Sequence, residues 1–402
     1  MDPRVGLRRD PAPDLDEVGE DAGLVERIRA EIRTTGPMPF VRFMALALYD
    51  PDGGYYRSRD ARPGRAGDFL TAPETHPIFG TTLARFVDDV WQGLGRPDRF
   101  IVQEHGAGEG ALAIAVMTGL RASRSALAEV IRYRPIEVDP RRVAAFEYHV
   151  SDAGFGSSIE TAADAPFTGL VLANEVADAL PVHRVVQRGT ELLEVRVGLD
   201  GTRFVDVETA PSTPDLFVRL AAEGVSLVDG QRGEICLALD GWVAEATAGL
   251  ERGVALLIDY GYPARELYDP VRRRDGTLRA YVRHTVHDDP YVHIGRQDLT
   301  AHVDVDAVVR ATTDAGLAHL GTTTQAEFLV GLGMDEHLRA IQTDPATTME
   351  SYLAVRSSVM RLLDPAATGR FRVMAFGRDW PNAPGSENAR PLAGFGYRAK
   401  WR

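Results

Sequence analysis

Residues 100–110 read FIVQEHGAGEG, and this stretch decides the fold. The apolar start predicts a short buried strand, and a glycine at every second position after it predicts a tight turn. The small and apolar residues 111–121 predict a helix directly after the turn. A strand that enters a helix through glycines is typical of ligand-binding α/β proteins, because the turn lets the backbone approach a ligand closely.

Further apolar segments extend this strand-turn-helix pattern. Residues 132–140, 170–175 and 254–260 each predict a strand, and the chain between them leaves room for helices. Strands that alternate with helices indicate a parallel sheet covered on both faces. We therefore predict an α/β protein with a Rossmann-like sheet.

The chain divides into four predicted segments. Residues 1–22 are rich in proline and acids and predict a disordered lead-in, and residues 23–99 predict N-terminal helices and a lid-like loop. Residues 100–322 are the predicted core, in which residues 183–250 are an inserted antiparallel β and helical region because their pattern alternates. Residues 323–402 predict a helical segment and a closing strand.

Composition and charge narrow the functional classes. The 402 residues carry a net charge of −13 and a single cysteine, Cys236. The acidic balance argues against nucleic-acid binding and is compatible with a cationic substrate. One cysteine cannot form an internal disulfide, and no apolar run is long enough to span a bilayer, so we predict a cytoplasmic protein without a membrane partner. His284, His287 and His293 match no closed zinc pattern, so no metal is predicted.

Acidic residues flank the glycine turn. Glu104 lies two positions before Gly106, and Glu137 ends the next predicted strand. A dinucleotide loop holds a pyrophosphate and disfavours a carboxylate there, whereas a cofactor with an ammonium and a sulfonium group favours one. We therefore predict S-adenosyl-L-methionine, bound by Glu104, Gly106, Gly108 and Gly110, with Glu137 on the ribose hydroxyls. An NAD-dependent oxidoreductase is the alternative, which the GxGxG spacing and Glu104 disfavour.

Polar residues also follow the later strand. Asn174, Glu175 and Asp178 lie beyond its carboxyl end, where ligands bind in parallel sheets. Two carboxylates three residues apart lie on one side of a starting helix and can hold a planar guanidinium between them. We predict Glu175 and Asp178 as catalytic residues and Asn174 as a cofactor-binding residue. The structural alternative is a helix N-terminal cap.

Several blocks of the sequence resemble the MidA-type methyltransferases. Besides the segments above, they are residues 53–56, 67–74, 78–80, 259–262, 298–304 and 374–378. The resemblance implies a Rossmann-like methyltransferase sheet, S-adenosylmethionine as cofactor and an arginine guanidine as acceptor. The family includes a mitochondrial assembly factor that methylates an arginine on a respiratory complex I subunit.

One of these blocks, the loop that begins at Gly67, is long and contains aromatic and proline residues. We predict that it closes over the cofactor as a lid. Gly67, Thr71 and Pro73 are expected to contact the cofactor. Asp68 and Glu74 are the second choice for the acceptor clamp.

Two departures from the family pattern concern the acceptor. The family's loop ELGPGRG reads EHGAGEG here, and its motif NEFFDALP reads NEVADALP, so Val176 and Ala177 replace two aromatics. Because the apolar wall shrinks, we predict free L-arginine or a small guanidine metabolite as the substrate. The alternatives are an arginine-containing protein that is an assembly partner, or a non-catalytic cofactor-binding scaffold. A homodimer is left open.

Overall fold

The computed structural model describes residue 15 and residues 17–58, 76–160, 166–381 and 391–396. They form two compact units whose segments interleave along the chain. The described parts of Met1–Leu70, Ala177–Trp242 and Gly261–Val308 belong to unit 1, and those of Thr71–Val176, Val243–Tyr260 and Val309–Arg402 belong to unit 2. The segment boundaries predicted near residues 22, 99 and 322 stay predictions.

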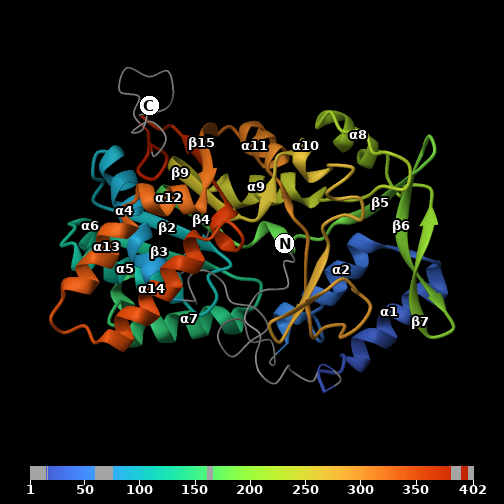
Figure 1. The fold of residues 1–402 in the computed structure, drawn as a ribbon, viewed down its shortest axis with the longest axis horizontal. Helices are drawn as coiled ribbons and strands as arrows, with labels where there is room; N and C mark the ends of the chain where they lie inside the picture. The colour runs from blue at the N-terminus through green and yellow to red at the C-terminus, as the bar shows by residue number, and fades with distance from the viewer. Residues whose placement is uncertain (1–14, 16, 59–75, 161–165, 382–390, 397–402) are drawn as a thin grey trace. The chain divides into compact units, whose positions relative to one another are not determined.

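Unit 2 is built on a six-stranded sheet in the order β15-β16-β9-β4-β2-β3 (Figure 1). Its strands are β2 Phe100–His105, β3 Ile131–Ile136, β4 Phe167–Asn174, β9 Leu250–Asp259, β15 Ala318–Thr324 and β16 Arg372–Arg378. Strands β9, β4, β2 and β3 are parallel, whereas β16 is antiparallel to both β9 and β15. The predicted α/β fold with a mostly parallel sheet is therefore confirmed.

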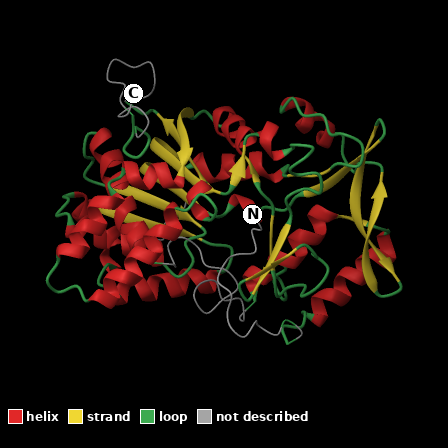
Figure 2. Cartoon of the chain, in the orientation of Figure 1, coloured by secondary structure: helices red, strands yellow, loops and turns green. Residues whose placement is uncertain are grey.

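Helices pack around this sheet (Figure 2). They are α4 Ile78–Gly93, α5 Ala111–Ala122, α6 Leu127–Val130, α7 Pro140–Asp152, α12 Gln325–Gly331, α13 Met334–Thr343 and α14 Met349–Leu363, with the short 3₁₀ turns η2 Gly156–Ser158 and η4 Thr368–Arg370. All six residues of β2 are buried, because β3 and β4 pair with it on either side. Its carboxyl end is therefore held by a paired strand on each side.

Unit 1 contains smaller sheets. A five-stranded antiparallel sheet combines β1 Met38–Pro39, β5 His183–Arg188, β6 Glu191–Asp200, β7 Arg203–Thr209 and β8 Arg232–Ile235. The other strands are β11 Arg279–Val282, β12 Thr285–His287 and β13 Asp298–Thr300, and the parallel pair β10 Gly261–Tyr262 and β14 Val303–Asp304. The predicted antiparallel region within residues 183–250 is thus present.

Helices and two 3₁₀ turns complete unit 1. They are α1 Ala22–Thr35, α2 Phe40–Tyr49, α8 Asp215–Ala222 and α10 Ala264–Leu267, with η1 Tyr55–Arg57 and η3 Ala177–Ala179. Two further helices, α9 Ala238–Ala248 and α11 Val305–Asp314, begin in unit 1 and end in unit 2. None of the helices in the described ranges combines the length and the apolar character needed to cross a membrane.

Each unit has its own hydrophobic core. In unit 2, Phe79, Phe86 and Phe146 are fully buried among residues from the helices and from β2, β4 and β9. In unit 1, residues of α1 and α2 such as Ile28 and Phe43 pack with residues of the small sheets. Burial of large apolar side chains supplies most of the driving force for each core.

Candidate active site

The glycine turn joins β2 to α5 at the carboxyl edge of the parallel strands. Gly106, Gly108 and Gly110 adopt positive φ values of 68°, 56° and 89°. The turn is tied to the end of β3, because Gly106 N donates to Ile136 O at 2.9 Å and Gly108 N donates to Glu137 Oε1 at 2.6 Å. A Cβ atom on Gly108 would meet no described atom within 4 Å, so the turn leaves open space at this position.

Glu104, in β2 just before the turn, is a buried acid. It is 3% exposed, and its Oε2 atom has no hydrogen-bond partner within the described residues. Burial raises the pKa of Glu104 to about 8, while an interaction with Tyr133 opposes the rise and the charge of Glu137 adds to it. A buried carboxylate with an unused oxygen favours a cationic ligand, because pairing offsets the cost of burying the charge.

Glu137 directly follows β3 and is half-buried. Burial raises its pKa, and the hydrogen bond from the Gly108 amide works against this rise. A carboxylate accepts several hydrogen bonds, so Glu137 can hold the turn and still accept bonds from two vicinal hydroxyls. Glu104, in β2, and Glu137, just after β3, therefore lie near the carboxyl ends of adjacent strands, beside the glycine turn, as predicted from the sequence.

The ends of β4 and β9 bring a second group of polar residues to the same edge. Glu175 has a φ value of 53°, and its N–H donates to Ile258 O at 2.8 Å. Asn174 Nδ2 donates to Glu175 Oε1 at 3.2 Å, while Asn174 Oδ1 is buried and unpaired among the described residues. Val176 lies next to the glycine turn, since a Cβ atom on Gly106 would approach its Cγ2 atom to 2.9 Å.

Asp259 supports this edge in a way that the sequence analysis missed. It is 3% exposed, and its two carboxylate oxygens accept hydrogen bonds from Val176 N at 3.2 Å and from Tyr260 N at 2.8 Å. The bond to Val176 holds the chain just after Glu175. The sequence signals at this position were an acid at the end of a predicted strand and the family block of residues 259–262.

Asp178 belongs to unit 1, whereas Glu175 belongs to unit 2. Asp178 is 6% exposed, lies in η3, and accepts a hydrogen bond from Ala301 N at its backbone carbonyl. The neighbouring Ala179 carbonyl accepts a bond from the Tyr49 hydroxyl at 2.9 Å. The clamp of Glu175 with Asp178 stays a prediction.

The lid-like loop lies outside the described residues. This applies to the five residues assigned there, which are Gly67, Asp68, Thr71, Pro73 and Glu74. Their predicted contacts with the cofactor and the acceptor therefore stay predictions.

The donor set of unit 2 fits S-adenosylmethionine. Glu104 offers a buried carboxylate oxygen to an ammonium group, and Glu137 offers acceptors to ribose hydroxyls. The open space at Gly108 lets a ligand approach the backbone. A pyrophosphate would instead meet the Glu104 carboxyl group, which disfavours a dinucleotide.

Comparison with known proteins agrees with this chemistry. Residues 82–323 match a family described as "Putative S-adenosyl-L-methionine-dependent methyltransferase". A Burkholderia thailandensis protein with S-adenosyl-homocysteine bound in its crystal structure is 34% identical, with 93% of this chain and 96% of that chain covered and a TM-score of 0.82. The chain belongs to this methyltransferase family. The resemblance to the MidA-type methyltransferases is thereby confirmed, and the methyltransferase uses S-adenosylmethionine as its cofactor.

Curated relatives of this methyltransferase carry more specific names. A Drosophila melanogaster protein, 29% identical over 384 residues, is named protein arginine methyltransferase NDUFAF7 homolog, mitochondrial; the match covers 88% of this chain and 84% of the relative. The Homo sapiens protein arginine methyltransferase NDUFAF7, mitochondrial, is 28% identical over 351 residues, with coverage of 79% and 75%. The NAD-dependent oxidoreductase alternative is excluded by the family.

These relatives also correct one prediction. The predicted cytoplasmic location is wrong, because the curated relatives are named as mitochondrial proteins. The prediction used the single cysteine, which indicates a reducing compartment. That signal does not distinguish one reducing compartment from another.

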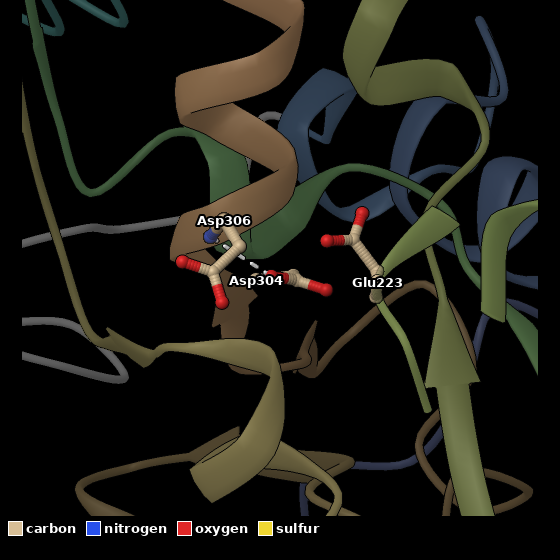
Figure 3. Close-up of side chains that lie close together, drawn as sticks. All are labelled: Glu223, Asp304 and Asp306. Carbon is tan, nitrogen blue, oxygen red and sulfur yellow. Dashed lines mark hydrogen bonds between the residues drawn. The ribbon is translucent and has the colours of Figure 1, made fainter. Parts of the chain in front are cut away.

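Unit 1 contains an acidic cluster that the sequence analysis did not identify. Figure 3 shows the carboxylates of Glu223, Asp304 and Asp306, each of which has an oxygen within 4.8 Å of the others. Burial raises the pKa of Asp304 to about 7, and the charge of Glu223 adds to this rise. Asp304 Oδ1 caps α11 by accepting bonds from Asp306 N and Ala307 N. The cap gives Asp304 a structural role, and no ligand is assigned to the cluster.

Proposed function

We propose that this methyltransferase acts on a guanidine nitrogen of arginine and that Glu175 orients the guanidinium. The observation that carries the proposal is the backbone of Glu175, whose φ value of 53° is uncommon for a residue other than glycine. Such strain persists where the surrounding structure holds a residue in place, and it is concentrated at functional sites. The bond to Ile258 and the contact with Asn174 hold Glu175 at the edge that carries the glycine turn.

The chemistry of a guanidinium explains why an acid is needed. A guanidinium is a poor nucleophile, because its lone pairs are delocalised and its pKa exceeds about 12. A carboxylate that accepts two N–H bonds orients one nitrogen and balances the charge. Bound S-adenosylmethionine supplies the methyl group, and alignment of nitrogen, methyl carbon and sulfur is the main requirement of an in-line displacement. Glu175 is our candidate for this alignment, with Asp178 as its predicted partner.

We propose an arginine within a protein as the acceptor. The names of the curated relatives, which are protein arginine methyltransferases, support this choice over a small metabolite. The loss of two family aromatics at Val176 and Ala177 supports a wider acceptor site, so free L-arginine is the competing acceptor.

Transfer of a labelled methyl group tests the proposal. Arginine-containing peptides, free L-arginine, and hydroxyl and carboxyl compounds are incubated with the protein and labelled S-adenosylmethionine, and the products are identified by mass spectrometry. Arginine peptides should accept the methyl group. Glu175→Gln should reduce turnover by roughly a hundredfold or more, because alignment is lost, while affinity for S-adenosylhomocysteine stays within about twofold.

Glu245→Gln is the matched control, because Glu245 is an exposed acid of the same unit. Wild-type turnover in Glu175→Gln would reject Glu175 as the orienting residue and would turn attention to Asp68 and Glu74. Methyl transfer to a hydroxyl or carboxyl compound but not to arginine would reject the guanidine acceptor. No transfer to any compound would favour the cofactor-binding scaffold.

A further inference from the structure

A chain of buried polar groups lies on the sheet next to the glycine turn. His105, the last residue of β2, is 9% exposed, and its Nε2 atom lies 3.1 Å from Gln103 Nε2. Gln103 Nε2 also donates to Ala246 O at 3.1 Å, and Gln103 Oε1 accepts from Arg134 Nη1 at 3.2 Å. Arg134 is 1% exposed and pairs with Glu160 at 3.0 Å. This side-chain network is separate from the carboxylates that fit the cofactor.

The partners of Gln103 settle which end of its amide faces His105. An arginine only donates hydrogen bonds, so the atom that faces Arg134 must be the amide oxygen. A backbone carbonyl only accepts, so the atom that faces Ala246 must be the amide nitrogen. If the amide were rotated by half a turn, its nitrogen would face the Arg134 donor and its oxygen would face the Ala246 carbonyl. Both hydrogen bonds would then be lost.

This orientation determines the protonation of His105. Because Gln103 Nε2 is a donor, His105 Nε2 can complete the 3.1 Å contact only as an acceptor. His105 is then neutral, with its proton on Nδ1. Burial lowers the pKa of His105 to about 4, against an opposing effect of the Ala246 carbonyl.

Among the described residues, the charged groups beside Gln103 and His105 are consistent with a neutral ring. On β3, Arg134 contacts Gln103 and its charge is balanced by Glu160. On α9, the neutral Ala246 carbonyl accepts from Gln103 Nε2 and opposes the lowering of the His105 pKa. Glu104, the neighbour along β2, points to the opposite face of the strand, because side chains alternate along a strand.

We propose that Gln103, held by Arg134, is a positioning residue that keeps His105 a neutral hydrogen-bond acceptor and so anchors the start of the glycine turn for cofactor binding. A protonated His105 would place a positive charge beside the turn that receives a cationic cofactor. The MidA-type pattern has leucine at this position, so a histidine here requires polar partners on the sheet. This inference concerns the cofactor and does not depend on the identity of the acceptor.

Nitrogen NMR of the wild-type protein labelled at histidine gives the first test. The spectrum of His105→Leu lacks one histidine ring signal, and the missing signal is thereby assigned to His105. We expect Nδ1 of His105 to carry the proton and the ring to stay neutral down to about pH 5. A proton on Nε2, or titration near the ordinary histidine pKa of about 6.5, would overturn the proposal.

A double-mutant cycle gives the second test. Gln103→Met keeps the length of the side chain and removes both hydrogen-bonding ends, so binding of S-adenosylhomocysteine should weaken by about fivefold. When His105 is already replaced by leucine, Gln103→Met should weaken binding by less than about half as much, because the contact between Gln103 and His105 is already absent. The tautomer of His105 should also change in Gln103→Met, which a general loss of stability would not cause.

Gln92→Met is the matched control, because Gln92 is an exposed glutamine of unit 2 whose side-chain nitrogen donates to Asp88. It should change neither the tautomer nor the affinity. Equal effects of Gln103→Met in the two backgrounds would overturn the proposal. If Gln103→Met does not fold, the wild-type NMR result still decides the question.

Discussion

At the scale of single residues, we predict that Glu104 couples cofactor binding to pH. Its carboxyl group is buried, and burial raises its pKa to about 8, so it carries a proton near neutral pH before a cation arrives. Pairing with the ammonium group of S-adenosylhomocysteine favours the ionised form, so binding should release a proton. Affinity should therefore rise by roughly tenfold or more between about pH 6 and about pH 8.

Calorimetry in buffers with different heats of ionisation counts the released proton. Glu104→Gln should bind weakly and show neither the proton release nor the pH dependence. The free energy of unfolding should also change: because the folded pKa lies above the unfolded value of 4.5, wild-type stability should fall as the pH rises from about 4.5 towards 8. Binding that is independent of pH with no proton released would reject this account.

At the scale of elements, two glycines of one turn should behave differently. Gly108 faces open space, so Gly108→Ala should lower the free energy of unfolding by only about 1–2 kcal/mol, the cost of a left-handed alanine. At Gly110 an added Cβ atom would lie 2.9 Å from Val150 and 3.1 Å from Phe146 in α7. Gly110→Ala should therefore cost about 2–4 kcal/mol, since overpacking adds to the strain.

Gly108→Ala should weaken cofactor binding more than Gly110→Ala does, although it lowers the free energy of unfolding less. The new methyl group at Gly108 fills the space through which a ligand reaches the backbone, so S-adenosylhomocysteine should bind at least about tenfold more weakly. Chemical denaturation and calorimetry on the two variants measure both quantities. A larger loss of affinity for Gly110→Ala than for Gly108→Ala would show that the ligand does not approach the turn at Gly108.

At the scale of the whole molecule, the cofactor should stabilise the fold. A ligand at about a hundred times its Kd adds about 2.7 kcal/mol to the free energy of unfolding, and the unfolding midpoint should rise by several degrees. At a pH above about 8, S-adenosylhomocysteine should produce this shift and NAD should not, because the ionised Glu104 opposes a pyrophosphate. A shift with NAD of similar size would contradict the assignment of the donor set.

The positions of much of the candidate cofactor site were predictable from local sequence. Glu104, the glycines and Glu137 lie at the ends of short apolar strands, and parallel strands bring their carboxyl ends to one edge. The antiparallel insertion was predictable for a similar reason, because alternating residues require a sheet with one buried face. The cytoplasmic location was not, because the single cysteine reports only on redox conditions.

By itself, the sequence determined the α/β fold, the methyltransferase family and the cofactor, because these depend on short motifs, each of which can be recognised within one stretch of the chain. Only the tertiary structure decided the left-handed backbone of Glu175, the support from Asp259 to Val176, and the orientation of Gln103 between Arg134 and Ala246. These features join residues that are far apart in the sequence. Hydrogen-bond partners, and with them the protonation of buried groups, are therefore set only when the strands have paired and the helices have packed.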